Sequence, residues 1–206
     1  FLITNKTKNN DTDIFEVNDE LLFQNILIIN EDFYQYPFNV FKHTVETGYN
    51  CNWPYGYRTN VDSFWHSEKI KNKLRSVIPL KLRNKHLRGV SYSILRNMYK
   101  SHGRWNHIDS EEQGLWANVI YTHPFPIITA GTSINFFENN VNNFEYSINQ
   151  KLEYKNDPNK WYSSVFFGNR FNKHVMYSSN SFHNSCEHFG NTITNCRCVN
   201  TFFVEN

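Results

Sequence analysis

A run of short β-type segments in the C-terminal part of the chain is the feature that most constrains the fold. From residue 87 onward, β-branched and aromatic residues gather in short stretches, and Gly131 and Gly168 stand between some of them. Stretches of this kind, bounded by turn residues, are typical of strands. The predicted strands are 88–99, 104–109, 115–122, 132–137, 162–167, 171–179 and 193–204.

The region before these strands predicts a different local structure. Residues 21–29 predict a strand or hairpin that enters the core. Residues 37–48 predict a helix, because Pro37 falls in its first turn and Gly48 ends it. A second helix is expected at 64–77, where apolar residues recur at helical spacing, namely Phe64, Ile70, Leu74 and Val77. Helices followed by many short strands predict an α+β fold, with a jelly-roll core (a double-stranded β-helix) and the N-terminal helices packed on one sheet.

The length of 206 residues fits one domain with a substantial core. We expect a single domain over 1–206, with N-terminal support over about 14–85 and the jelly-roll core over about 87–206. The stretch 138–160 is polar and rich in Asn, and it predicts an insertion without core residues. We expect it to form a mobile lid over the mouth of a cavity.

Charge and hydropathy exclude some classes of partner. The formal net charge is +2, and basic residues are scattered among acidic ones, which argues against a nucleic-acid partner. The densest basic cluster lies on the second predicted helix and favours a solvated face; it comprises Lys69, Lys71, Lys73 and Arg75. No apolar stretch approaches the roughly 20 residues that span a bilayer, so no membrane partner is expected.

The order of ionisable residues predicts a metal centre. His107 and Asp109 form a His-x-Asp pair, and His183 follows after a long gap. Two imidazoles and one carboxylate can occupy one face of an octahedral Fe(II) and leave the other positions open. On a strand, residues two apart point to the same side. An isolated pair of this type also fits an exposed loop, and His174 and His188 compete with His183 for the third ligand position.

The four cysteines leave a second metal hypothesis open. Cys186, His188, Cys196 and Cys198 form a C-x-H…C-x-C pattern that resembles a zinc site. Structural zinc sites more often contain C-x2-C pairs, and C-x-C also fits a strand that buries small residues. A zinc-stabilised interaction module is therefore one alternative, and a non-catalytic jelly-roll binding protein is another. A disulfide framework is not expected with so few cysteines.

Several segments in order resemble a known family. They include "WNHID" at 105–109 and the Ala130-Gly131-Thr132 step. The others are 26–48, 52–58, 116–137, 169–185 and 189–206. Together they resemble the Fe(II)/2-oxoglutarate-dependent dioxygenases of the prolyl-hydroxylase-like superfamily, and within it a group of small phage and bacterial proteins. A phage origin would imply the cytoplasm of the host cell as the location, and a cytoplasmic location is expected in either case.

The resemblance implies roles for particular residues. His107, Asp109 and His183 would hold Fe(II). Arg197, on the last strand, would bind the C5 carboxylate of 2-oxoglutarate through a bidentate fork, with Arg170 as its rival. Many relatives carry a hydroxyl residue two positions after the arginine, where this chain has Val199. The second donor to that carboxylate therefore stays open among Tyr99, Tyr121, Thr132 and Asn118.

The implied reaction is hydroxylation of a substrate with O2 and 2-oxoglutarate, which releases succinate and CO2. Halogenating relatives replace the carboxylate ligand with a small residue, so Asp109 favours hydroxylation. A peptidyl side chain such as proline is the favoured substrate, small molecules come next, and nucleobases are less favoured. The candidates for lining a substrate groove in this interpretation are the aromatic residues Trp53, Tyr55, Tyr57, Trp65, Trp161 and Tyr162.

Overall fold

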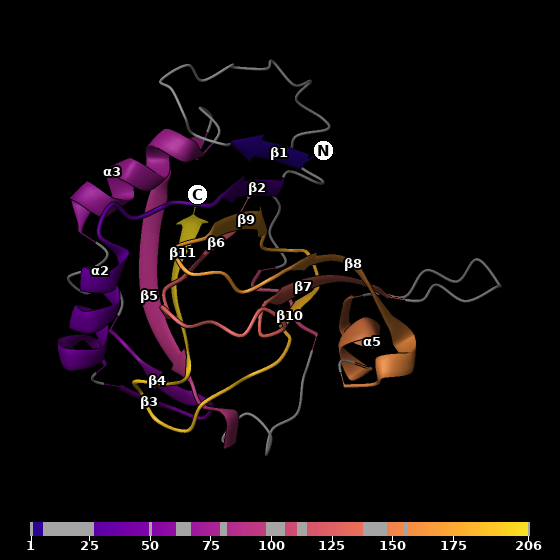
Figure 1. Cartoon of the computed structure of the whole chain (residues 1–206). Coiled ribbons are helices and arrows are strands. Elements are labelled where there is room, and N and C mark those ends of the chain that lie inside the picture. Colours follow the sequence, from indigo (N-terminus) through magenta and orange to yellow (C-terminus); the bar gives the residue numbers. More distant parts are fainter. Residues whose placement is uncertain are drawn as a thin grey trace.

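The computed structural model shows a mostly β architecture with short helices beside one sheet (Figure 1). It describes residues 2–5, 27–49, 51–60, 67–78, 82–97, 106–110, 115–137, 148–154 and 156–205. No helix in these ranges is long and apolar enough to cross a bilayer.

The larger sheet has eight strands in the described part of the chain. All neighbours pair antiparallel except β1 and β2, which run parallel. In spatial order the strands are β1 (Leu2–Asn5), β2 (Leu27–Asn30), β9 (His174–Ser178), β6 (Trp116–Tyr121), β11 (Arg197–Glu205), β5 (His86–Ile94), β4 (Gly56–Arg58) and β3 (Cys51–Trp53).

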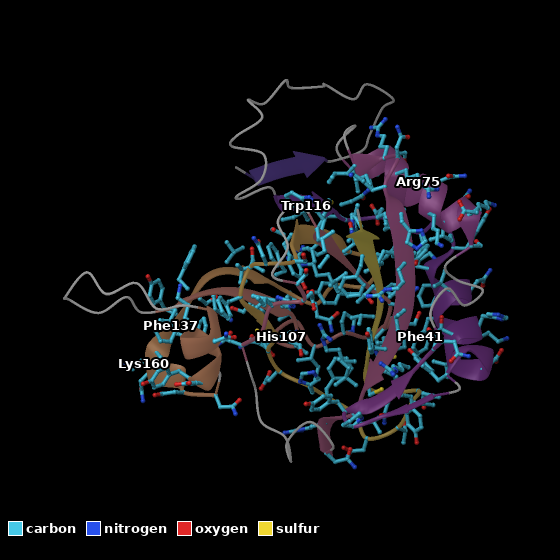
Figure 2. All side chains as sticks on the ribbon, turned by 180° about the vertical axis from the view of Figure 1, so that it is seen from behind. Phe41, Arg75, His107, Trp116, Phe137 and Lys160 are labelled. Atoms are coloured by element: carbon cyan, nitrogen blue, oxygen red, sulfur yellow. The ribbon has the colours of Figure 1, made fainter. Side chains whose placement is uncertain are left out.

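A smaller antiparallel sheet faces the larger one. Its order is β10 (His183–Ser185), β7 (Thr132–Phe137) and β8 (Trp161–Phe167). The helices are α2 (Pro37–His43), which continues as a π-helical turn over Thr44–Gly48, then α3 (Glu68–Val77), α5 (Ile148–Glu153) and a 3-10 turn at Pro158–Lys160. In Figure 2, Arg75 of α3 and Lys160 lie toward opposite ends of the molecule, with His107 between them.

Strand alternation gives the large sheet two different faces. Helices α2 and α3 cover one face through Val40 and Leu74. The apolar strand residues packed with them are Leu87, Trp116, Ile120, Met176, Phe202 and Val204. The opposite face forms a second cluster with the small sheet, comprising Ala117, Val119, Tyr121, Phe167, Val175, Tyr177 and Val199. The predicted packing of helices on one sheet is confirmed. The opposite face of the large sheet is not covered by these helices and can border a ligand site.

Most predicted elements are present in the described ranges. The strands at 115–122, 132–137 and 162–167 and the helix at 37–48 are confirmed, and Pro37 begins that helix. Of the other N-terminal predictions, 27–30 is a strand and 68–77 is helical, whereas 21–26 and 61–66 lie outside the described residues.

Three strands are shorter than predicted. Strand β5 ends at Ile94, although the prediction ran to residue 99. Strand β9 begins at His174, because Asn172 adopts a positive φ of 66° in the turn before it. Strand β11 begins at Arg197, since Asn195 accepts the backbone N–H groups of Asn191 and Thr192 in a turn.

The expected strand at 104–109 is wrong for the residues described there, 106–110. His107 forms one isolated β-bridge with His183, and the chain then bends at Asp109. The carbonyl of Ser179 accepts the backbone N–H groups of both Asp109 and Ser110. These bonds turn the chain after a single bridge, so the His-x-Asp pair lies on an irregular segment.

The polar stretch 138–160 contains regular structure in its described part. Helix α5 and the 3-10 turn lie at the far end of β7 and β8 (Figure 1). The Trp161 indole N–H donates to the Tyr154 carbonyl at 2.8 Å, and the Trp161 ring contacts Phe137 and Phe182. Within the ranges that the structure describes, the helix and the 3-10 turn contribute no residue to the core clusters, so the insertion at about 138–160 stays a prediction. Residues 138–147 lie outside the described residues, and the mobile lid stays a prediction.

Candidate metal centre

Two short segments meet beside β10 and carry the predicted ligands. His107 and His183 exchange backbone hydrogen bonds, with N···O distances of 3.0 and 2.9 Å. The Asp109 N–H donates to the Ser179 carbonyl at 2.8 Å. The backbone therefore fixes the His-x-Asp segment against the segment that delivers His183.

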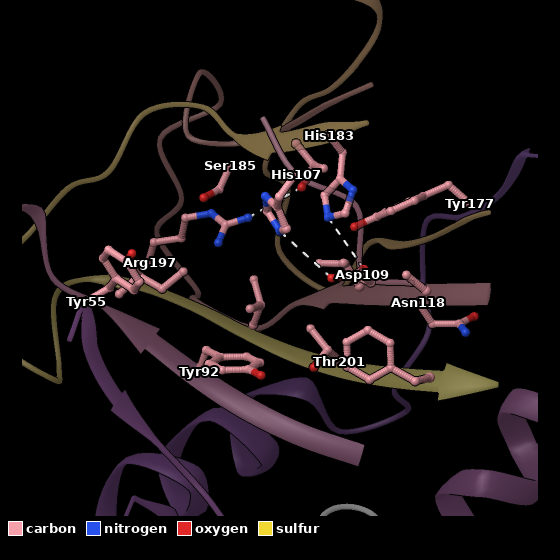
Figure 3. Close-up of a pocket in the computed structure, with 16 residues that line it drawn as sticks. Tyr55, Tyr92, His107, Asp109, Asn118, Tyr177, His183, Ser185, Arg197 and Thr201 are labelled. Carbon is pink, nitrogen blue, oxygen red and sulfur yellow. Dashed lines mark hydrogen bonds and ion pairs between the residues drawn. The ribbon is translucent and has the colours of Figure 1, made fainter. Parts of the chain in front are cut away.

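The three side chains converge at one point (Figure 3). Their potential ligand atoms all lie within 4.8 Å of one another. Asp109 Oδ1 is 3.8 Å from His107 Nε2, and Asp109 Oδ2 is 3.5 Å from His183 Nε2. Ligands at about 2.0–2.2 Å from a divalent metal are about 3 Å apart when adjacent, so small side-chain rotations would complete the coordination. Among the described residues, no other group of His, Cys, Asp and Glu side chains converges in this way.

The surroundings of His183 prepare it to bind a metal. Its Nδ1 lies 2.9 Å from the Ser181 carbonyl, and an Nδ1–H donated there leaves the Nε2 lone pair free to coordinate. Burial lowers the pKa of His183 to about 4, so the imidazole is neutral at ordinary pH. The ring of Tyr177 packs against it, with centroids 4.9 Å apart. A buried neutral imidazole fixed through its other nitrogen is a typical metal ligand.

Asp109 supplies the negative charge. Its side chain exposes 21% of its surface. Burial raises the pKa of this carboxyl group, and the charge of a protonated His107 opposes the rise. A divalent cation would favour the ionised form much more strongly.

The competing residues lie elsewhere. His174 is fully buried on the helix-covered face, where its Nε2 bonds Asn118. His188 Nε2 bonds the Ser185 hydroxyl. Cys198 of β11 and Cys196 just before it are buried with Leu95, so the strand interpretation of C-x-C holds for Cys198 alone. These cysteines and His188 do not come together as zinc ligands with Cys186.

Arg197 points into the same cavity from the start of β11. Its side chain is almost fully buried, and its Nε donates to the Ala130 carbonyl at 2.8 Å. Its Nη2 lies 3.5 Å from Thr132 Oγ1, and the guanidinium carbon lies 5.6 Å from the Tyr121 ring centroid. The Tyr121 hydroxyl donates to Thr132 Oγ1 at 2.8 Å. The structure thus gathers the Arg197 cation and the Thr132 hydroxyl at one end of the cavity, with Tyr121 bonded to Thr132.

Gly131 makes this arrangement possible. A Cβ built on Gly131 would lie 1.9 Å from the Phe167 carbonyl oxygen, so a larger residue would push β7 away from β8. The step Ala130-Gly131-Thr132 therefore brings a backbone carbonyl and a hydroxyl to Arg197 from adjacent positions. The carbonyl partner was not predicted, because main-chain acceptors leave no mark in the sequence.

The structure does not bring to Arg197 the other described residues predicted to bind 2-oxoglutarate. Asn118 borders the cavity, but both polar atoms of its amide are engaged on the helix-covered face: Nδ2 donates to the Phe202 carbonyl, and Oδ1 bonds His174 Nε2. Figure 3 shows the Asn118 amide turned away from the triad. Tyr99 lies outside the described residues. Arg170, the rival of Arg197, is exposed in the turn after β8 and does not line the cavity.

The cavity between the triad and the large sheet has a volume of about 180 Å³. Figure 3 shows the triad and Arg197 on one side and Tyr92 and Thr201 opposite them. Of the aromatic residues proposed for a groove, Tyr55 lines the cavity, whereas Tyr57 packs on the other face of the sheet. Lining residues that sequence reasoning missed are Tyr92, Ile94, Ala117, Val119, Tyr177, Ser185, Thr201 and Phe203. Alternation along β5, β6, β9 and β11 was the available signal for most of them.

Comparison with known proteins gives a likeness at the level of structure. No protein-family model and no curated protein sequence matches this chain. The crystal structure of HygX from Streptomyces hygroscopicus with nickel and 2-oxoglutarate bound is similar, with a TM-score of 0.50 and 11% identity over 91% of this chain and 87% of HygX. HygX with iron bound gives a TM-score of 0.52 and 10% identity over 91% and 86% of the two chains. The two facing sheets therefore form a fold like that of HygX, consistent with a double-stranded β-helix.

Proposed function

We propose that this chain is an Fe(II)- and 2-oxoglutarate-dependent dioxygenase that hydroxylates an organic substrate and releases succinate and CO2. One observation carries the proposal: the triad of His107, Asp109 and His183 shares a cavity with the buried Arg197. A protein of similar fold, HygX, crystallises with iron and with nickel and 2-oxoglutarate.

The donor set fits Fe(II). Two neutral imidazoles and one carboxylate occupy one face of an octahedral ion and leave positions for cosubstrate and O2. Iron held there would supply the activation of O2, with 2-oxoglutarate as the source of electrons. The chain contributes the fixed Nε2 of His183, the charge of Asp109 and the backbone bridge that holds His107 beside them.

The residues at the Arg197 end fit the distal carboxylate of 2-oxoglutarate. The Nε–Ala130 bond orients the guanidinium, whose remaining N–H groups can form a bidentate fork with a carboxylate. The Thr132 hydroxyl lies beside that fork, lines the cavity and accepts from Tyr121, which leaves its own O–H to donate. This supports Thr132 as the second donor in place of Val199, with Tyr121 orienting it. Val119 and Val199 form an apolar floor that excludes water and strengthens charge interactions. A peptidyl substrate such as proline stays a prediction.

The test is an anaerobic titration of 2-oxoglutarate into the Fe(II) protein, followed by the metal-to-ligand charge-transfer absorption. Loss of a buried charge partner costs about 2–5 kcal/mol. Arg197→Ala should therefore weaken 2-oxoglutarate binding by roughly 30-fold to several thousand-fold. Fe(II) affinity should stay unchanged, because no ligand is altered.

Two further variants sharpen this test. Arg197→Lys should also bind 2-oxoglutarate less tightly, since an ammonium group cannot reproduce the fork. Arg170→Ala removes an exposed arginine and should behave as wild type. Unchanged affinity in Arg197→Ala would remove Arg197 from the cosubstrate site. Absence of any charge-transfer band in the wild type would refute the proposed function itself.

A further inference from the structure

The large sheet presents two arginines beside the cavity, on the face that carries Arg197. Arg58 of β4 pairs with Tyr92 of β5, and Arg88 of β5 pairs with Phe203 of β11. Directly paired residues share a face of the sheet. Tyr92 and Phe203 line the cavity, so each arginine neighbours a cavity-lining aromatic residue on that face, and we call the two the rim arginines. Both arginines are exposed, in contrast to the buried Arg197.

Each rim arginine contacts its aromatic partner. The guanidinium of Arg88 lies over the Phe203 ring, 5.6 Å from the centroid. Arg58 lies directly across from Tyr92, where its charge opposes the rise in the pKa of the Tyr92 hydroxyl. Contact with the aromatic partners limits the conformations of these long side chains and keeps both cations beside cavity-lining residues.

The charges that act on Tyr92 agree with this arrangement. Burial raises the pKa of Tyr92, the charges of Arg58 and Arg88 oppose that rise, and Asp109 adds to it. The Tyr92 hydroxyl is therefore within electrostatic reach of both rim guanidiniums and of the metal-binding carboxylate. Tyr92 and the triad line the same cavity, so a ligand group that contacts this hydroxyl would lie in the cavity that holds the metal ligands.

The net charge of the metal centre, once metal and 2-oxoglutarate are bound, determines whether that centre can neutralise the rim arginines. A divalent metal, the Asp109 carboxylate, dianionic 2-oxoglutarate and the Arg197 guanidinium carry no net charge together. Asp109 is the sole acidic residue among the described residues that line the cavity. The loaded centre therefore offers the rim arginines no net negative charge, and an anion from outside would be attracted to them.

We propose that the prime substrate of this site is a small organic anion, whose carboxylate or phosphate group binds at the rim to Arg58, Arg88 and the Tyr92 hydroxyl. This inference rests on the proposed function. The cavity of about 180 Å³ is smaller than the usual range of roughly 300–1,000 Å³ for ligand sites. With 2-oxoglutarate seated against Arg197, the remaining space suits a short carbon segment over the triad, with the anionic group outside it.

The experiment measures ¹⁹F relaxation of three probes with the Mn(II)- and 2-oxoglutarate-loaded protein. The probes are 4-fluorobenzoate, 4-fluorophenyl phosphate and the neutral 4-fluorobenzamide. Paramagnetic Mn(II) enhances relaxation only of a probe bound near the triad. At least one anionic probe should show saturable enhancement that the amide lacks, and the preferred anion distinguishes a carboxylate from a phosphate ester. Excess 2-oxoglutarate should not displace it.

Variants assign the effect to the rim. The double variant Arg58→Gln, Arg88→Gln should weaken binding of the anionic probe by about tenfold to a hundredfold, the usual range for hydrogen bonds to charged groups. The matched control Arg170→Gln, which removes an exposed arginine away from the cavity, should bind it normally. Mn(II) and 2-oxoglutarate affinities, measured separately, should be unchanged in both.

Several outcomes would overturn the inference. Equal enhancement by acid and amide, or none by either anion, would exclude an anion site. Full binding in the double variant would indicate coordination to the metal alone, and competition with 2-oxoglutarate would place the probe at Arg197. Failure of the wild type to bind Mn(II) or 2-oxoglutarate would instead contradict the proposed function.

Discussion

The two faces of the large sheet bury polar groups in different ways. On the helix-covered face, Asn200 donates to the Tyr34 hydroxyl at 2.9 Å and accepts from Ser91 at 2.8 Å. Asn118 and His174 are paired there as well. On the cavity face, Arg197 and the triad direct polar atoms toward open volume. Burial of a polar residue therefore does not identify a site by itself. The distinguishing property is the direction of its donors and acceptors.

Strand β11 supplies both faces from one sequence. Cys198, Asn200, Phe202 and Val204 alternate with Arg197, Val199, Thr201 and Phe203. The first set packs under the helices or bonds within that layer, whereas the second set lines the cavity. A difference between the faces in stability and in ligand binding can therefore be tested with neighbouring residues of a single strand.

The largest expected effect compares Phe202 with Phe203. Phe202 is fully buried under the helices, and Phe202→Ala should lower the free energy of unfolding by about 3–5 kcal/mol. Phe203 is half-buried at the cavity, so Phe203→Ala should cost only about 1–2 kcal/mol. Urea unfolding of the metal-free proteins measures both. Equal losses would show that the cavity face is as important for stability as the helix-covered face.

The next effect concerns Asp109. Asp109→Ala should weaken Mn(II) or Fe(II) binding by more than about a hundredfold, or about 2.8 kcal/mol, since even partners outside the coordination sphere often matter at the tenfold to hundredfold level. Unfolding of the metal-free protein should be unaffected or slightly harder at neutral pH, because burial raises the pKa of this carboxyl group and so disfavours its ionised form in the fold. Asp32→Ala, at an exposed position, is the control. A stability loss without a metal defect would make Asp109 a structural residue.

The smallest effect is a pH dependence from the helix-covered face. Burial lowers the pKa of His174 to about 3, so between that value and about 6.5 the unfolded chain binds a proton that the fold does not. The contribution of the neutral His174 to the free energy of unfolding is full above pH 6.5. It falls as the pH is lowered, and about 2 kcal/mol of it is lost at pH 5. His174→Gln should reduce the difference between urea midpoints at pH 7 and pH 5, whereas His86→Gln, at an exposed position, should not. The same change in urea midpoint between pH 7 and pH 5 for the wild type and both variants would show that His174 does not cause the pH dependence.

Features that depend on local sequence were predictable. Pro37 begins its helix, and the alternation over 115–122 and 132–137 gives β6 and β7. The order of His107, Asp109 and His183 predicted a shared site, and their side chains converge in the structure.

Features that depend on contacts between distant segments were not predictable. The bend at Asp109 depends on the Ser179 carbonyl, and the orientation of Arg197 depends on the Ala130 carbonyl. The rim arginines depend on the β4–β5 and β5–β11 registers, which a single sequence does not contain. The residue types of one sequence and their spacing do not specify which main-chain groups will pair or which register two strands will adopt.

The backbone bridge between His107 and His183 has a thermodynamic consequence for metal loading. The two ligands lie far apart along the chain, and bringing them together costs loop-closure entropy. Main-chain bonds, including those from Asp109 and Ser110 to Ser179, have already met that cost when the protein folds. Little of the free energy of metal coordination is therefore offset by the entropy cost of ordering the chain. Such a site is a rigid chelator whose exchange of metal need not unfold its surroundings.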